Sequence, residues 1–166
     1  MANVTFQENP VTLLGKEINE GDQAPDFTAL SNDLKAVSLN DHKGKVKLIS
    51  VVPSVDTGVC SLQTQRFNNE AASIGNVQVI TVSMDLPFAQ KRWVEENKVD
   101  KLDLLSDHRN ADFGEKYGVL IEELRLLARS IFVIDSDDKV TYKEVVSEVS
   151  NHPDYDKALE AARQAK

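Results

Sequence analysis

Cys60 is the only cysteine in this chain of 166 residues, and it follows a loop whose composition suits a reactive site. The stretch that leads to it, residues 51–60, reads VVPSVDTGVC. Thr57 stands three residues before the thiol, Pro53 ends the apolar run, and Gly58 allows close approach of the backbone. A thiolate is a strong nucleophile, and a hydroxyl three residues away can reach the sulfur or a ligand bound to it. This stretch therefore offers the residue types that thiol chemistry at Cys60 would need.

Cys60 is predicted to lie in the first turn of a helix. Small or apolar residues recur after it in steps of four and three, which places them on one helix face; they are Thr64, Phe67, Ala71 and Ile74. The residues assigned to the solvated face are Gln63, Gln65, Arg66 and Asn69. The unpaired N–H groups and the macrodipole at a helix start stabilise a thiolate. The spacing alone nevertheless favours an alternative, an inert core cysteine, because free cysteines are commonly buried.

The rest of the chain supplies the elements that position this helix. The first 15 residues alternate around the sequence QENP and predict an N-terminal β-hairpin. Apolar, β-branched runs at 45–52 and 77–83 predict buried strands, each followed by a helix. The remaining elements are a strand at 102–106, a helical segment at 110–118, a hairpin over 130–146 and a helix from Pro153. This order predicts one α/β domain over residues 1–166, with a mixed central sheet and helices on both faces.

Composition and charge narrow the classes of function. The hydrophobic fraction is 41% and the charged fraction 28%, a balance typical of folded globular proteins rather than disordered chains. A formal net charge of −8 disfavours binding to nucleic acid and to anionic membranes. No apolar run reaches the roughly 18 residues that a membrane span needs. The N-terminal residues lack a secretory signal pattern, and a single cysteine suits a reducing cytoplasm.

Metal and cofactor sites are not expected. The three histidines, His42, His108 and His152, are scattered along the chain and show no spacing of metal ligands. Solvated loop positions are therefore predicted for all three.

Four longer motifs extend across the chain: GDQAPDF, PSVDTGVCSLQTQRFN, SMDLPFAQKRW and LLARSIFVID. Together they resemble the thiol peroxidase branch of the peroxiredoxin family, and the resemblance runs from NPVT near the N-terminus to PDYDKAL near the C-terminus. The resemblance implies a thioredoxin-like fold with an N-terminal hairpin at about residues 1–15. It also implies reduction of hydrogen peroxide and organic hydroperoxides through a cysteine sulfenic acid, without a cofactor.

The resemblance further implies a role for each of four residues. Cys60 matches the thiolate that attacks peroxide, and Thr57 matches the hydroxyl that binds peroxide and polarises the thiolate. Pro53 matches the proline that shields the site, and Arg129 the cation that favours the thiolate and steadies the transition state. These roles are chemically coherent, because charge moves to the departing oxygen and donors aimed at that oxygen lower the barrier.

One position departs from the family pattern. The thiol peroxidase branch usually carries a second, resolving cysteine after the DLPFAQ motif, whereas this chain has Val94 in that slot, followed by EENK. The chain is therefore interpreted as a one-cysteine member that is recycled by an external thiol, with thioredoxin as a candidate reductant. The family resemblance suggests a homodimer. The missing cysteine also keeps an alternative open, a peroxide-sensing or redox-relay protein with little turnover.

Overall fold

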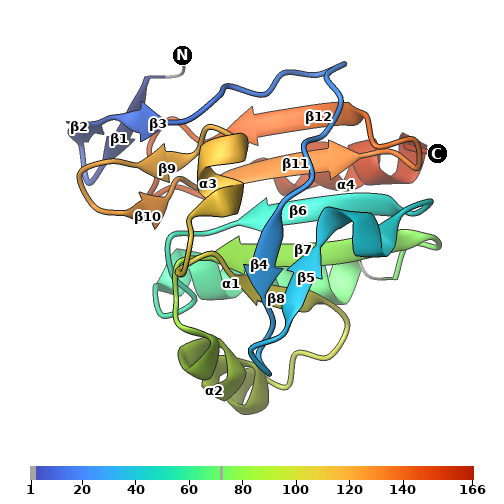
Figure 1. The fold of residues 1–166 in the computed structure, drawn as a ribbon, viewed down its shortest axis with the longest axis horizontal. Coiled ribbons are helices and arrows are strands. Elements are labelled where there is room, and N and C mark those ends of the chain that lie inside the picture. Colours follow the sequence, from blue (N-terminus) through green and yellow to red (C-terminus); the bar gives the residue numbers. More distant parts are fainter. Residues whose placement is uncertain (1–2, 72) are drawn as a thin grey trace.

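The computed structural model describes residues 3–71 and 73–166, and within them a seven-stranded sheet forms the centre of the molecule (Figure 1). Its strands, in spatial order, are β12 (Val140–Val145), β11 (Ser130–Ile134), β6 (Val46–Val51), β7 (Val77–Ser83), β8 (Asp103–Ser106), β4 (Thr28–Leu30) and β5 (Ala36–Ser38). The pairs β6–β7 and β7–β8 are parallel, while the other neighbours are antiparallel. The prediction of a mixed sheet is confirmed.

Helices cover both faces of this sheet (Figure 1). They are α1 (Gly58–Glu70), α2 (Pro87–Asn97), α3 (Asp112–Lys116) and α4 (Tyr155–Gln164), with a short 3-10 helix, η1 (Leu39–His42). In the view of Figure 1, α1 and α4 lie behind the sheet and α3 lies in front of it. Pro87 occupies the first turn of α2, where its missing N–H costs no hydrogen bond.

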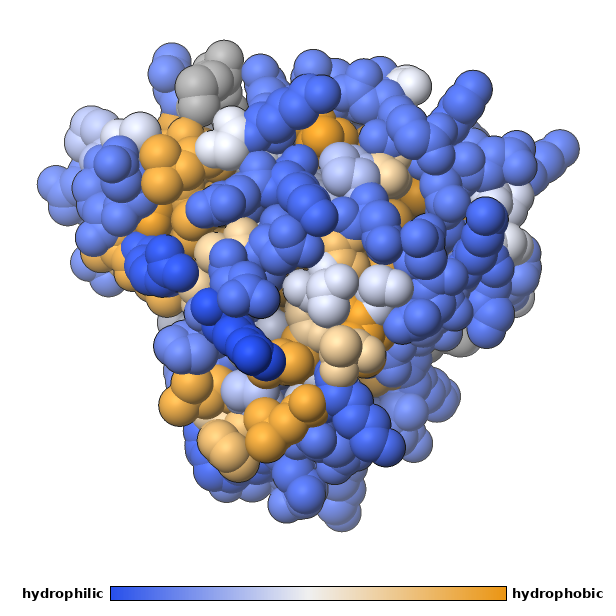
Figure 2. Space-filling model, in the orientation of Figure 1, coloured by the Kyte–Doolittle hydropathy of each residue, from blue (hydrophilic) through white to orange (hydrophobic). Residues whose placement is uncertain are grey.

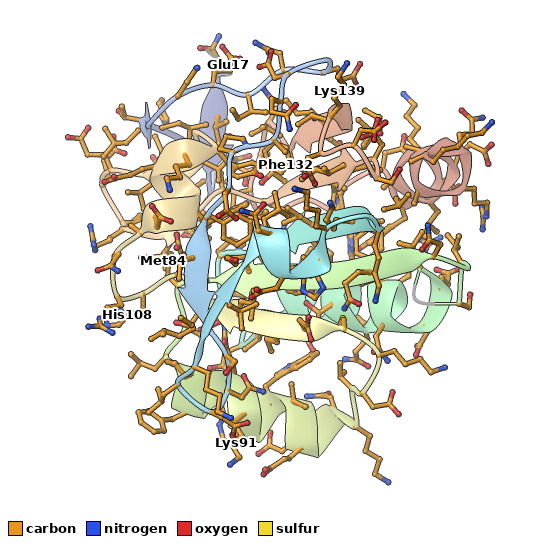
Figure 3. All side chains as sticks on the ribbon, turned by 45° about the vertical axis from the view of Figure 1, so that its right-hand side comes forward. Glu17, Met84, Lys91, His108, Phe132 and Lys139 are labelled. Carbon is orange, nitrogen blue, oxygen red and sulfur yellow. The ribbon has the colours of Figure 1, made fainter. Side chains whose placement is uncertain are left out.

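The central strands are buried on both faces, which explains why they read as continuous apolar runs. On β11, Val133 packs in one cluster with Phe67 of α1 and Leu159 of α4. The adjacent Phe132, near the centre of Figure 3, points to the other face and meets Phe113 of α3 edge-on at a centroid distance of 6.3 Å. Because successive side chains of a strand alternate, one strand contributes to both cores.

The predicted N-terminal hairpin is present as β1 (Val4–Phe6) and β2 (Asn9–Val11), which pair in antiparallel register. Its two-residue turn, Gln7-Glu8, has positive φ at both positions, 50° and 68°. Asn, Asp and Gly are the usual residues in such a turn, because most other side chains are disfavoured there. The turn therefore needs support from elsewhere in the fold.

A second sheet, with the order β10-β9-β3, is absent from the sequence prediction. Its strands are β3 (Leu13–Leu14), β9 (Leu120–Ile121) and β10 (Leu126–Leu127). Strands of two residues show no alternation, so their sequence carries no periodic signal. Short length explains in the same way why β4 and β5 were not predicted.

The face shown in Figure 2 is mostly hydrophilic, with apolar groups gathered at a few places. Lys91, His108 and Lys139 lie at the periphery of the molecule in Figure 3. His108 is exposed, which confirms its predicted solvated position. None of the helices in the ranges described above is both long and apolar enough to cross a bilayer.

Candidate active site

The loop between β6 and α1 is held at the carboxyl ends of two parallel strands. Thr57 is the N-cap of α1, and its Oγ1 accepts a hydrogen bond from the backbone N–H of Cys60 (3.2 Å). The same hydroxyl donates to the carbonyl of Ser54 (3.3 Å). Asp85, just after β7, accepts from the Ser54 hydroxyl (2.6 Å) and from the N–H of Val55 (2.9 Å). This network sets where α1 begins, and Cys60 lies in the first turn as predicted.

The side chain of Cys60 is completely buried and nevertheless has a charged partner. Nη2 of Arg129 donates a hydrogen bond to its sulfur, with 3.2 Å between the two atoms. The thiol also shares an apolar cluster with Val52, Val55 and Trp93. The alternative of an inert core cysteine therefore accounts for the burial of Cys60 but not for the guanidinium against its sulfur.

Arg129 is only 2% exposed and uses all three of its nitrogens. Nε donates to the carbonyl of Val149 (2.7 Å), Nη1 to Oε1 of Gln63 (3.0 Å) and Nη2 to the Cys60 sulfur. None of these three acceptors is a carboxylate. A buried charge is costly unless an opposite charge compensates it. Among these three partners only the Cys60 sulfur can become anionic, so it is the one place in this contact where an opposite charge can lie.

Gln63 is part of this arrangement, and its prediction as a solvated residue is wrong. Its side chain has no exposed surface. Its Nε2 donates to the hydroxyl of Ser50 on β6 (2.8 Å), while its Oε1 accepts from Arg129. Gln63 thus fixes the guanidinium relative to the central sheet. The signal that could have located it is its distance of three residues from Cys60, which puts both side chains on neighbouring positions of one helix face.

A cavity of about 260 Å³ opens beside this group. It is lined by Phe6, Gln7, Pro53, Thr57, Gly58, Val59, Arg129, Val149 and Ser150. Three of the four predicted site residues therefore line one cavity, and the fourth, Cys60, is hydrogen-bonded to two of them through its sulfur and its backbone N–H. The hairpin residues Phe6 and Gln7 were not predicted as part of the site.

The slot that the family pattern reserves for a resolving cysteine lies in α2. Val94 occupies it and packs, partly buried, against the apolar cluster that contains Cys60. The helix is held against α1 by Trp93, whose Nε1 donates to the hydroxyl of Ser61 (3.2 Å). Asn97 closes the same turn by donating to the carbonyl of Trp93 (2.9 Å). The segment near Cys60 is thus a packed helix without a thiol.

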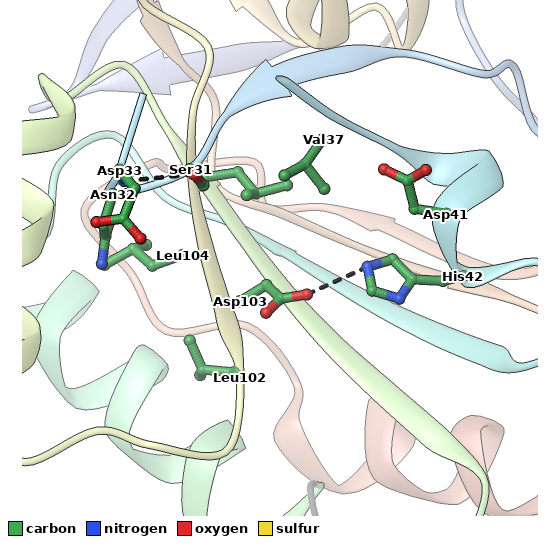
Figure 4. A pocket seen from close by; sticks show the side chains of 10 residues that line it. Ser31, Asn32, Asp33, Val37, Asp41, His42, Leu102, Asp103 and Leu104 are labelled. Atoms are coloured by element: carbon green, nitrogen blue, oxygen red, sulfur yellow. Dashed lines mark hydrogen bonds and ion pairs between the residues drawn. The ribbon is translucent and has the colours of Figure 1, made fainter. Parts of the chain in front are cut away.

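A larger cavity, of about 420 Å³, lies at the sheet edge formed by β4, β5 and β8 (Figure 4). His42 and Asp103 face each other across it, with 3.1 Å between Nε2 and the carboxylate oxygen. The His42 side chain is 15% exposed, so its prediction as a solvated residue is wrong. Across residues 3–71 and 73–166, no group of three or more His, Cys, Asp or Glu side chains is arranged to hold a metal ion. The cavity offers no thiol, and size alone does not make it the reactive site.

Comparison with known proteins agrees with this geometry. The redoxin family matches residues 19–159 of the chain. The thiol peroxidase of Oceanobacillus iheyensis is 67% identical over 159 residues, which cover 96% of this chain and 97% of that protein. The thiol peroxidase of Bacillus subtilis is 61% identical over 163 residues, with 98% of each chain covered.

Solved structures give the same result at the level of the fold. A peroxiredoxin-like protein from Aquifex aeolicus superposes with a TM-score of 0.93 and is 41% identical, covering 99% of this chain and 97% of that chain. The thiol peroxidase from Chromobacterium violaceum superposes with a TM-score of 0.87 at 24% identity, covering 96% and 94% of the two chains. The thioredoxin-like fold expected from the sequence is therefore confirmed.

Proposed function

This chain belongs to the thiol peroxidase branch of the redoxin family, and we propose that Cys60 is the thiol with which it reduces peroxides. The observation that carries the assignment is the buried guanidinium of Arg129, which contacts the Cys60 sulfur at 3.2 Å and has no carboxylate among its acceptors. The positive charge of a cation held in this way is balanced by a thiolate but not by a neutral thiol. It also remains available to the charge that develops during the reaction.

The first half-reaction transfers one oxygen atom. The Cys60 thiolate attacks the hydrogen-bearing terminal oxygen of the peroxide, and an S–O bond forms as the O–O bond breaks. The departing oxygen takes a proton from solvent, equal to the one that the thiol gave up on ionising, and leaves as water or an alcohol. Arg129 faces the sulfur and donates to the transition state. Thr57 and Pro53 line the same cavity, and we assign to Thr57 the orientation of the peroxide and to Pro53 the exclusion of water. Cys60 is left as a sulfenic acid.

The second half-reaction needs a thiol from outside the chain, because the sequence has no other cysteine. An external thiol condenses with the sulfenic acid, which releases water and forms a mixed disulfide. A second thiol then attacks that disulfide and frees Cys60. We infer an external reductant of this kind, with thioredoxin as the first candidate to test. The alternative of a sensor with little turnover gains no support from the relatives.

Three further expectations remain part of the proposal. The continuous sheet from β12 to β5 supports a single domain over residues 1–166. Exposed apolar side chains, such as Leu86 and Phe88 at the start of α2, suit a homodimer contact. A lone free thiol suits the cytoplasm. Light scattering on the purified protein tests the dimer directly.

Steady-state consumption of hydrogen peroxide with dithiothreitol or with thioredoxin and its reductase tests the function. We expect many turnovers per protein molecule, and none above background for Cys60→Ser. Intact-mass measurement after peroxide alone should show one added oxygen on Cys60, followed by two and three with excess peroxide. If the protein consumes only one equivalent of peroxide, both with dithiothreitol and with thioredoxin, the result would support the sensor. Full activity of Cys60→Ser would refute the assignment of Cys60.

A further inference from the structure

The turn at residues 54–57 precedes α1, and its first peptide unit, which joins Ser54 to Val55, provides an acceptor for the hydroxyl of Thr57. The carbonyl of Ser54 accepts from the backbone N–H of Thr57 (3.2 Å) and from its hydroxyl (3.3 Å). The N–H of Val55 belongs to the same peptide unit and, because a trans peptide is planar, it points away from that carbonyl. A group that holds this N–H therefore also fixes the direction of the carbonyl.

Asp85 holds this N–H from outside the turn. Its Oδ2 accepts from the N–H of Val55 (2.9 Å), and its Oδ1 accepts from the hydroxyl of Ser54 (2.6 Å). The oxygen of that hydroxyl in turn accepts from the N–H of Asp56 (3.1 Å). Hydrogen bonds to an ionised carboxylate are stronger than those to a neutral acceptor. Asp85 does not line the Cys60 cavity, so its contact with the site runs through the turn.

The position of Asp85 is fixed by buried groups of the parallel sheet and of α2. Its Oδ2 also accepts from the hydroxyl of Ser83 at the end of β7 (2.6 Å), and the oxygen of that hydroxyl accepts from Nε2 of Gln90 on α2 (2.9 Å). Its backbone carbonyl accepts from the hydroxyl of Ser106 at the end of β8. Ser83, Gln90 and Ser106 are all buried. One residue thus anchors the turn to two strands and a helix.

From these contacts we propose that Asp85 is a positioning residue for the peroxidase reaction: by fixing the first peptide unit of the turn, it holds the hydroxyl of Thr57 in the Cys60 cavity. The proposal rests on the peroxidase function assigned to Cys60. Without Asp85, the N–H of Val55 loses its acceptor, and the peptide unit can rotate and take the Ser54 carbonyl away from Thr57. Because Asp85 acts through Thr57, its removal should cost little once the Thr57 hydroxyl is absent.

The neighbouring strand offers a matched control. Asp107 directly follows β8, and its carboxylate accepts from the backbone N–H groups of Phe113 (2.9 Å) and Gly114 (2.8 Å) in α3. Like Asp85, it is a carboxylate beyond the carboxyl end of a parallel strand that binds backbone N–H groups. Neither Asp107 nor these two donors line the Cys60 cavity. Removing Asp107 should therefore lower stability without moving the Thr57 hydroxyl.

The test is a double-mutant cycle of Asp85→Ala and Thr57→Val, with kcat/KM for hydrogen peroxide measured on the folded fraction. We expect Asp85→Ala to lower kcat/KM about tenfold in the parent, the scale of a misplaced group, and less than about twofold in the Thr57→Val background. Asp107→Ala should change kcat/KM less than about twofold in both backgrounds. No loss in the parent, equal losses in the two backgrounds, or the same pattern in the control would overturn the proposal.

Two further variants keep the test decisive. Asp85→Asn retains an oxygen that can accept from the N–H of Val55, so it should recover most of the rate lost in Asp85→Ala. A rate as low as that of Asp85→Ala would count against positioning. If Asp85→Ala does not fold, Ser54→Ala takes its place in the cycle with the same expectation, because it removes the hydroxyl that joins Asp85 to the turn.

Amide hydrogen exchange supplies a readout that does not depend on activity. Asp85→Ala should speed exchange at the N–H groups of Val55 and Thr57, and Asp107→Ala should leave both unchanged. Unchanged exchange in Asp85→Ala would refute the anchoring of the turn. A parent protein without peroxidase activity would refute the proposed function instead, and the exchange result would still decide whether Asp85 holds the turn.

Discussion

Two buried cations, Lys47 and Arg129, have partners of different charge in this fold. Lys47 lies in β6 with no exposed surface, and its ammonium forms an ion pair with the carboxylate of Asp138. Arg129 is buried to nearly the same degree, yet its partners are a carbonyl, an amide oxygen and the Cys60 sulfur. The charge of Lys47 is compensated whatever the redox state of the protein. Among the three acceptors of Arg129, only the Cys60 sulfur can carry a negative charge, and from this difference we propose that the Lys47 pair is structural and the Arg129 contact reactive.

Breaking the Lys47 pair should produce the largest loss of stability. Asp138→Asn leaves the ammonium buried without a counter-ion, which lowers the free energy of unfolding by about 3–5 kcal/mol. Asn suits the positive φ of 63° at this position, so the backbone is retained. Urea unfolding measures the loss, and kcat/KM of the folded fraction should stay at the parent value. Asp137→Asn, at the exposed neighbour, is the control and should change neither quantity.

Removing Arg129 should have the opposite result, a large loss of activity with a smaller loss of stability. Arg129→Met takes away the donor to the Cys60 sulfur, and we expect the second-order rate with hydrogen peroxide to fall about 10²- to 10³-fold. The loss of stability should be smaller than for Asp138→Asn, because an apolar side chain of similar length replaces the buried charge itself. Arg129→Lys should not restore the rate, since an ammonium cannot reproduce the three-pronged contact. A variant that unfolds as easily as Asp138→Asn but keeps its rate would make Arg129 structural.

Thr57→Val should give the smallest of the three effects, and it should lower both the rate with peroxide and the stability. Loss of the hydroxyl from the cavity lowers the peroxide rate about 10²-fold, the scale of one missing transition-state donor. The family resemblance implies a catalytic role for this hydroxyl, but the structure also makes it the N-cap of α1, so about 1 kcal/mol of stability should be lost as well. Thr57→Ser retains the hydroxyl and should recover both properties. A normal rate with reduced stability would leave Thr57 as a cap only.

The sequence predicted the parts of the site that lie close together along the chain, but not the contacts between residues far apart in the chain. The strand, the loop and the helix that carry Thr57 and Cys60 follow from hydrophobic periodicity within one short stretch. Arg129 came only from the family resemblance, because periodicity does not pair residues that lie 69 positions apart. Gln63 was misassigned because its amide looks like a surface group until the buried guanidinium is in place.

Lys47 illustrates the same limit in the core. Its position within the run KVKLISVV identifies a strand but gives no indication that its ammonium is buried. The partner carboxylate, Asp138, lies 91 residues away in the turn between β11 and β12. Buried polar pairs of this kind are decided by tertiary packing, which the local sequence does not encode.

The separations along the chain within the site have a consequence for biosynthesis. The contacts of Arg129 with Gln63 and Cys60 span 66 and 69 residues, and the hydrogen bond from the hydroxyl of Thr5 in β1 to the carboxylate of Glu148 spans 143. Contacts of such high contact order form late in folding, after the local helices and hairpins. A nascent chain that has emerged from the ribosome only as far as α1 therefore carries Cys60 without its cation. Under the proposed function, we expect peroxide reactivity to appear only after Arg129, in the last third of the chain, has been synthesised and docked.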